Sequence, residues 1–257
     1  MKRFPLAIAA GVSALCLIAP GIASAQIVEL GQTSSAPVAA PSCPPGVSLS
    51  HCLIVLPRTT AVQTETNGVL NPTKVTKDGW IVAFTVGLSK LTSNASTELS
   101  LLKGLDAHWG GPPQIVLTAL KPGPKNKYTV AAQSATFHVL PFLGSVLQQP
   151  LSQPPTFTTM TAVPVKKGEV IGLTVLTWAP VLTYNLTASK YSYRQSRRAN
   201  CINPPGTQTA QTTVNASQQY LCNYTGTRVQ YSATEVVNQP YPKTYVGGPT
   251  PTKKSLR

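Results

Sequence analysis

Short segments in the middle of the chain carry the hydrophobic and polar patterns of β-strands. In the segment 80–86 every second residue is large and apolar, which predicts a strand with one buried face. The segment 170–176 is apolar at nearly every position, as is typical of a central strand that is buried on both faces. The same reasoning predicts further strands at 115–120, 128–132, 136–140, 182–187 and 229–233.

Glycine and proline separate these predicted strands. Turn signals occur at 77–79, 121–124 and 166–168. One segment, from about Thr97 to Leu105, has leucines at helical spacing, but Gly104 and the short length predict two helical turns at most. Short strands without alternating helices are typical of an all-β fold, and we expect a single antiparallel β-sandwich. The pattern alone does not separate a jelly-roll topology from an immunoglobulin-like one.

The N-terminus has the pattern of a secretory signal peptide. Two basic residues precede an apolar stretch over 6–22, and residues 23–25 (Ala-Ser-Ala) match the small-residue pattern of a cleavage site. We therefore expect residues 1–25 to be removed and the mature chain to be secreted, with no transmembrane segment left in it. The alternative is an uncleaved membrane anchor, which fits less well because Pro20 and Gly21 interrupt the apolar stretch.

Composition divides the expected mature chain into three parts. Residues 26–42 are rich in Ala, Ser, Thr and Pro without periodicity, which predicts a flexible leader. We expect the β-sandwich domain to span residues 43–239. Residues 240–257 combine four prolines with lysine and arginine, which predicts a disordered basic tail.

The expected mature chain has an even number of cysteines. In an exported protein, Cys43, Cys52, Cys201 and Cys222 predict two disulfides. Three connectivities are possible, and we expect the local one, Cys43–Cys52 and Cys201–Cys222, which closes two modest loops. A zinc site would need clustered cysteine and histidine ligands, and these spacings do not provide them. No metal and no cofactor is therefore predicted.

A set of motifs extends over more than half of the chain, between Gly79 and Val236. These motifs are Gly110-Gly111-Pro112, Leu120-Lys121-Pro122, Gln133-Ser134, the run from Pro164 to Val175, Thr177-Trp178-Ala179-Pro180, the run from Tyr193 to Arg197, Thr209-Ala210-Gln211 and the run from Tyr231 to Thr234. In them the chain resembles a group of uncharacterised secreted proteins from actinobacteria. The resemblance implies export and an all-β, jelly-roll-like sandwich, and its turn at 165–173 is similar to one in extracellular jelly-roll domains. It implies no catalytic residue, because the group has no established activity.

The charge balance argues against the common catalytic sites. Lys and Arg total 21 against 7 Asp and Glu, a net charge of +14, and losing the two signal-peptide cations leaves 19 − 7 = +12. Few carboxylates are available for the acid and base pair of a glycosidase, and three scattered histidines suit neither a Ser-His-Asp triad nor a zinc set. The stretch Asp106-Ala107-His108-Trp109 most resembles a catalytic site, but no nucleophile elbow accompanies it.

Aromatic and basic residues suggest binding instead. Trp109 follows His108 in a Gly/Pro-rich region, where its side chain is either buried or an exposed stacking platform. Three arginines lie within five positions after two tyrosines, and guanidinium groups bind phosphate and carboxylate in a bidentate manner. The candidate ligand-binding residues are His108, Trp109, Tyr191, Tyr193, Arg194, Arg197 and Arg198.

We interpret the chain as a secreted, non-enzymatic β-sandwich that binds a glycan or an acidic polymer at the cell envelope. No specific nucleic-acid partner is expected, because no motif for one is present and the chain is expected to be exported. One alternative is a structural or protein-interaction module without a small ligand. The other is a hydrolase that uses Asp106 and His108.

Overall fold

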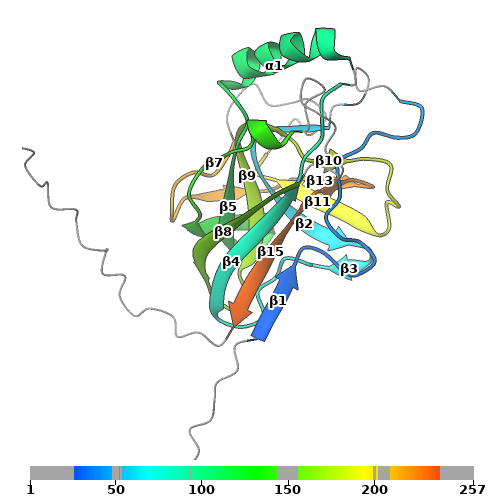
Figure 1. Cartoon of the computed structure of the whole chain (residues 1–257). Coiled ribbons are helices and arrows are strands. Elements are labelled where there is room, and N and C mark those ends of the chain that lie inside the picture. Colours follow the sequence, from blue (N-terminus) through cyan, green and yellow to red (C-terminus); the bar gives the residue numbers. More distant parts are fainter. Residues whose placement is uncertain are drawn as a thin grey trace, which may run out of the picture.

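Two antiparallel β-sheets pack face to face in the computed structural model (Figure 1). The structure describes residues 26–47, 52, 54–92, 94–143, 156–198, 201 and 209–237. The predicted signal peptide at 1–25 and the predicted basic tail at 240–257 lie outside the described residues. Within the described ranges, none of the helices is long and apolar enough to cross a membrane.

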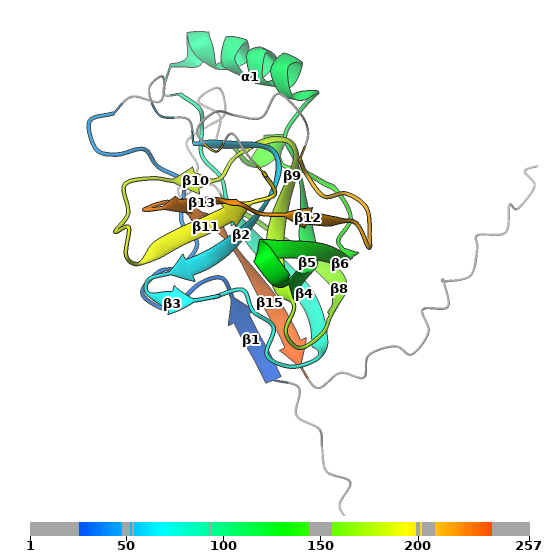
Figure 2. The same cartoon turned by 180° about the vertical axis from the view of Figure 1, so that it is seen from behind.

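The smaller sheet has the strand order β1-β15-β4-β8. Its strands are β1 (Gln26–Leu30), β15 (Tyr231–Val237), β4 (Gly79–Gly87) and β8 (Thr156–Val165). The larger sheet has the order β12-β6-β5-β9-β2-β11-β13 and faces the viewer in Figure 2. Its strands are β12 (Ser217–Gln219), β6 (Lys127–Gln133), β5 (Gln114–Gly123), β9 (Val170–Pro180), β2 (Val55–Thr66), β11 (Tyr191–Gln195) and β13 (Cys222–Thr225).

Four short strands and two 3-10 helices are described besides these two sheets and one α-helix. β3 (Val69–Leu70) pairs with β2, β7 (Phe137–His138) pairs with β5, and β10 (Leu182–Thr183) pairs with β14 (Arg228–Val229). The 3-10 helices are η1 (Pro124–Asn126) and η2 (Leu140–Phe142).

The core lies between the two sheets. The predicted apolar run at 170–176 begins β9, which lies between β5 and β2 and is buried along almost its whole length. Trp178, near the end of the same strand, is fully buried. Apolar residues of the smaller sheet, including Phe84, pack into the same core. The predicted all-β sandwich is confirmed.

A β-bulge in β4 changes which residues of that strand face the core. The alternation at 80–86 predicts one face made of every second residue, but Ile81 and Phe84 are both buried and Trp80 is only half-buried. The reason is that Val82 has no partner in β15, where Thr234 pairs with Ala83 and Glu235 pairs with Ile81. An extra residue in one strand reverses the side-chain alternation beyond it.

The helical segment is longer than predicted. α1 spans Ala95–Trp109 and lies at one end of the sandwich, away from β1 (Figure 1). The Asn94 side chain caps its start by accepting the Ser96 N–H, and Gly110 ends it in the left-handed conformation, at a φ of 87°. These caps satisfy backbone groups at both ends, which the spacing of the leucines does not reveal.

The prediction of a flexible leader at 26–42 is wrong. β1 forms the edge of the smaller sheet, with Gln26 opposite Val237 and Leu30 opposite Ala233. Farther along, the Ala39 N–H donates to the Gln230 side chain at 3.2 Å. Backbone hydrogen bonds hold this segment, and they do not depend on the hydrophobic periodicity that the segment lacks.

Both disulfides have the predicted local pairing. Cys43 and Cys52 have Cα atoms 5.8 Å apart, and Cys201 and Cys222 have Cα atoms 5.2 Å apart. Both separations lie in the usual range for disulfides.

Candidate functional site

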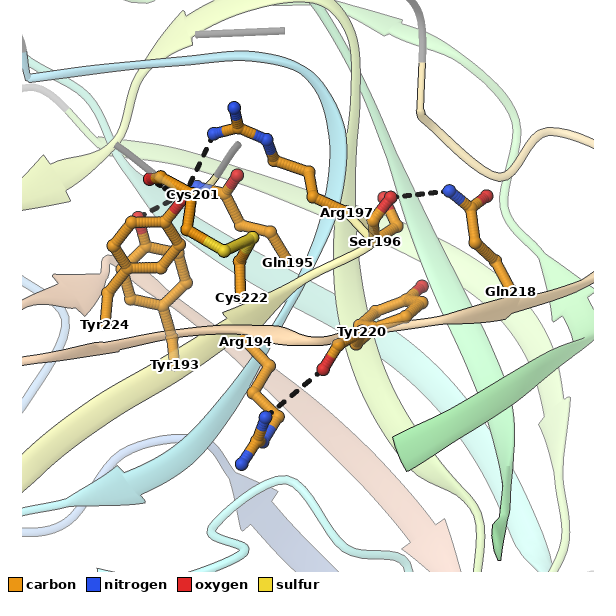
Figure 3. Close-up of a disulfide and its surroundings, with 10 residues drawn as sticks. All are labelled: Tyr193, Arg194, Gln195, Ser196, Arg197, Cys201, Gln218, Tyr220, Cys222 and Tyr224. Carbon is orange, nitrogen blue, oxygen red and sulfur yellow. Dashed lines mark hydrogen bonds between the residues drawn. A yellow bond between two sulfur atoms is a disulfide. The ribbon is translucent and has the colours of Figure 1, made fainter. Parts of the chain in front are cut away.

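Two of the predicted residues, Tyr193 and Arg197, lie beside the Cys201–Cys222 disulfide, near the point where β11 pairs with β13 (Figure 3). Tyr193 lies opposite Tyr224 in this pair of strands, and their rings stack with centroids 5.0 Å apart and an interplanar angle of 17°. The Gln195 side chain donates to the Tyr193 hydroxyl at 3.0 Å. Tyr193 is almost fully buried, so its ring is not available to a ligand.

Arg197 is also buried, with 4% of its surface exposed. Its Nη1 donates to the Tyr224 hydroxyl at 3.1 Å, and that hydroxyl in turn donates to the Cys201 carbonyl at 2.6 Å. The backbone carbonyl of Arg197 accepts the Leu221 N–H at 2.9 Å. The guanidinium therefore holds the disulfide loop together, which is a structural role.

Burial keeps the tyrosines of this region neutral. It raises the pKa of the Tyr184 phenol to about 12 and raises the pKa of Tyr193 far above its ordinary value. The pKa of Tyr224 is raised by burial too, although the neighbouring Arg197 opposes the shift. These hydroxyls act as uncharged hydrogen-bonding groups and not as proton carriers at neutral pH.

The remaining candidates in the segment 191–198 do not join this cluster. Arg194 points to the opposite side of the strand from Arg197, and its Nη1 donates to the Tyr220 carbonyl at 3.2 Å (Figure 3). Tyr191 is half-buried and Arg198 is exposed. Of the five residues predicted at 191–198, Tyr193 and Arg197 are therefore buried while the other three are half-buried or exposed, and together they do not form one binding patch.

The stretch at the end of α1 does not form a catalytic pair. The Asp106 Oδ1 accepts the Trp178 Nε1–H at 2.9 Å, so this carboxylate faces the sandwich. His108 is exposed, and residues two apart lie on different faces of a helix. Trp109 is only 5% exposed and contacts His108 edge to face, with ring centroids 4.4 Å apart. Trp109 is thus a core residue, and the exposed platform that was one reading of the sequence is wrong.

A basic surface that the sequence analysis missed lies elsewhere, where three turns meet. Seven exposed lysines form what we call the lysine cluster: Lys74, Lys77, Lys121, Lys125, Lys127, Lys166 and Lys167. The Gly and Pro residues of each turn predict a turn, but they do not predict a common surface. The one feature of the sequence that could have indicated this surface is that each of the three turn signals contains lysine.

The start of β9 brings these turns together. Val170 pairs with Leu120 of β5 on one side and bridges to Lys74 on the other. Two strand spacings separate the backbones of Lys74 and Leu120 by roughly 10 Å. Lys121 follows Leu120 directly, and the β5–β6 hairpin carries Lys125 and Lys127.

Two carboxylates at the same turns bind the backbone. The Asp78 Oδ1 accepts the Lys167 N–H at 2.8 Å, and the Glu169 Oε2 accepts the Lys166 N–H at 3.0 Å. Burial raises the pKa of Glu169, and the nearby lysines only partly oppose that shift. The carboxylates shape the turns, and the seven exposed lysines around them give this surface a large excess of positive charge.

Among the residues in the described ranges, no group of three or more His, Cys, Asp or Glu side chains is placed to hold a metal ion. Comparison with known proteins finds no matching family model, no matching curated protein and no matching solved structure.

Proposed function

We propose that this protein is secreted and binds an acidic polymer of the cell envelope through the lysine cluster, without catalysing a reaction. The observation that carries the proposal is the meeting of seven exposed lysines from three turns beside only two turn carboxylates. The two disulfides fit an oxidising, extracellular setting. The resemblance to uncharacterised secreted actinobacterial proteins, which rests on sequence motifs, stays a prediction.

The spacing of the lysines suits a repeating polyanion. At physiological ionic strength the Debye length is about 8 Å, close to the roughly 10 Å that separates the backbones on either side of Val170. Exposed charges farther apart than a Debye length are largely screened from one another, so the polymer must contact the ammonium groups directly, and a chain of carboxylates or phosphates would contact several of them at once. Each exposed contact contributes only about 0.2–1 kcal/mol, so binding requires many of them and weakens as salt rises.

An aromatic glycan site has less support than an acidic polymer. Trp109 and Tyr193, the aromatic residues predicted to stack on a ligand, are both buried. The hydrolase alternative lacks a paired acid and base, because Asp106 binds Trp178 while His108 faces solvent.

The test compares two triple variants with equal net charge. Lys121, Lys166 and Lys167 are changed to Gln in the first, and Lys90, Lys103 and Lys190, which are exposed but outside the cluster, are changed to Gln in the second. Binding of the mature protein to poly-glutamate and to polyphosphate is measured across a salt series, with neutral dextran as a control polymer.

We expect the cluster variant to lose about tenfold in affinity, since three exposed contacts together contribute on the order of 1.4 kcal/mol. The matched variant should lose much less, and dextran should not bind. Equal losses in the two variants would show that net charge alone acts and would overturn the assignment of the cluster. Absence of polyanion binding by the unaltered protein at low salt would overturn the proposed function itself.

A further inference from the structure

The first strand that the structure describes includes the residue that follows the predicted cleavage site. β1 starts at Gln26, which lies opposite Val237 at the edge of the smaller sheet. Cleavage after Ala25 would leave every described residue of β1 in place and would convert the backbone N–H of Gln26 into a free α-amine. The signal peptidase would therefore expose an N-terminal glutamine that is already held at the sheet edge.

An N-terminal glutamine contains both partners of a cyclisation. Its α-amine attacks the carbon of its own side-chain amide, so that a bond forms between the amine nitrogen and Cδ. The bond between Cδ and Nε2 then breaks, and Nε2 leaves as ammonia with one proton taken from the attacking amine. The product is a five-membered lactam, pyroglutamate, and the reaction consumes no oxidant and no other reactant.

Lys77 of the lysine cluster is placed to assist this step. Its Nζ donates a hydrogen bond to the Gln26 Oε1 at 3.1 Å, and both residues are exposed. A cation on the amide oxygen makes Cδ more electrophilic and stabilises the negative charge that develops on this oxygen during attack. The same positive charge favours the unprotonated α-amine, whose ordinary pKa is about 8.

We propose that Gln26 is a modification site and that the mature protein begins with pyroglutamate formed with the help of Lys77. This inference rests on the proposed function, because Gln26 becomes the N-terminal residue only if the protein is secreted and its signal peptide is removed. The lactam nitrogen remains a neutral backbone-type donor, whereas an ammonium group would place a charge at the start of β1. Cyclisation also removes the free amine that an aminopeptidase would need to start removing β1.

The first experiment determines the N-terminal residue of the secreted protein. The full-length precursor is secreted from a bacterial host, and the N-terminal peptide of the purified protein is analysed by mass spectrometry. We expect a peptide that begins at residue 26, is lighter than the encoded sequence by one ammonia, and resists Edman degradation until pyroglutamyl peptidase is added. A free Gln26 would overturn the modification, and a start at any other residue would overturn the cleavage on which it depends.

The second experiment tests the role of Lys77. A protease site placed directly before Gln26 releases the free glutamine at time zero, and the loss of ammonia is followed by mass. Lys77→Met should slow cyclisation by roughly threefold or more, a smaller effect than in enzymes because this donor is exposed. Lys74→Met, the control within the same cluster, should react like the unaltered protein.

Equal rates for Lys77→Met and the unaltered protein would remove Lys77 from the mechanism. Polyanion binding measured on the same samples separates this inference from the proposed function. A protein that binds the polymers but keeps a free Gln26 overturns only the modification, and a cyclised protein that binds no polymer overturns only the function.

Discussion

Glu235 offers the sharpest test of the packing between the sheets. Its side chain is fully buried on the inward face of β15, between Ala233 and Val237. Within the part of the chain that the structure describes, neither carboxylate oxygen has a hydrogen-bond partner. Burial raises the pKa of Glu235 to about 7, against an ordinary value of 4.5.

The direction of the pH dependence follows from this shift. The unfolded chain releases the proton of Glu235 near pH 4.5, whereas the folded chain keeps it up to about pH 7. The contribution to stability is thus fully present below pH 4.5 and is lost as the pH rises through 7. A pKa difference of this size corresponds to about 3 kcal/mol at most, since water entry and local rearrangement reduce the cost of the buried charge.

The assay is urea unfolding at several values between about pH 5 and about pH 8, where the linkage applies. We expect the unaltered protein to lose stability across this range and Glu235→Gln to show a much flatter profile. Some slope should remain in Glu235→Gln because burial also raises the pKa of Glu169. Glu29→Gln, which changes an exposed carboxylate on the neighbouring strand β1, should follow the unaltered protein. A Glu235→Gln profile as steep as that of the unaltered protein would refute the reasoning.

Two further predictions concern close packing and the disulfides. A Cβ at Gly87 would lie 2.0 Å from the Ala39 carbonyl oxygen, so Gly87→Ala should lower the free energy of unfolding by about 2–4 kcal/mol in urea. Gly104→Ala on α1, where a Cβ meets nothing within 4 Å, should raise helix stability by about 0.5–1 kcal/mol, and equal effects at the two glycines would contradict the packing. Cys201 and Cys222 are 21 residues apart, and replacing both by Ser should lower the free energy of unfolding by about 3 kcal/mol, measured by thermal unfolding. Replacing Cys43 and Cys52, which are 9 residues apart, should lower it somewhat less because the loop that this disulfide closes is shorter. An unchanged melting temperature in both double variants would argue against the disulfides.

The sequence by itself determined the fold class, and it favoured the local disulfide pairing among three possible ones. The apolar run at 170–176 identified the central strand β9, because a strand buried on both faces needs apolar residues at consecutive positions. Turn residues marked the ends of β5 and β8 for a similarly local reason, since Gly and Pro act on the backbone next to them. Local disulfide pairing was predictable because short loops bring two cysteines together often.

Only the tertiary structure decided which residues are buried and which ones meet. Burial of Trp109 and Arg197 depends on Trp178, Tyr224 and other partners far along the chain, and no local pattern encodes those contacts. The bulge at Val82 arises from pairing with β15, about 150 residues later in the chain. The lysine cluster and the place of Gln26 beside Lys77 arise in the same way, because sheet pairing joins turns and strand ends whose sequences carry no record of one another.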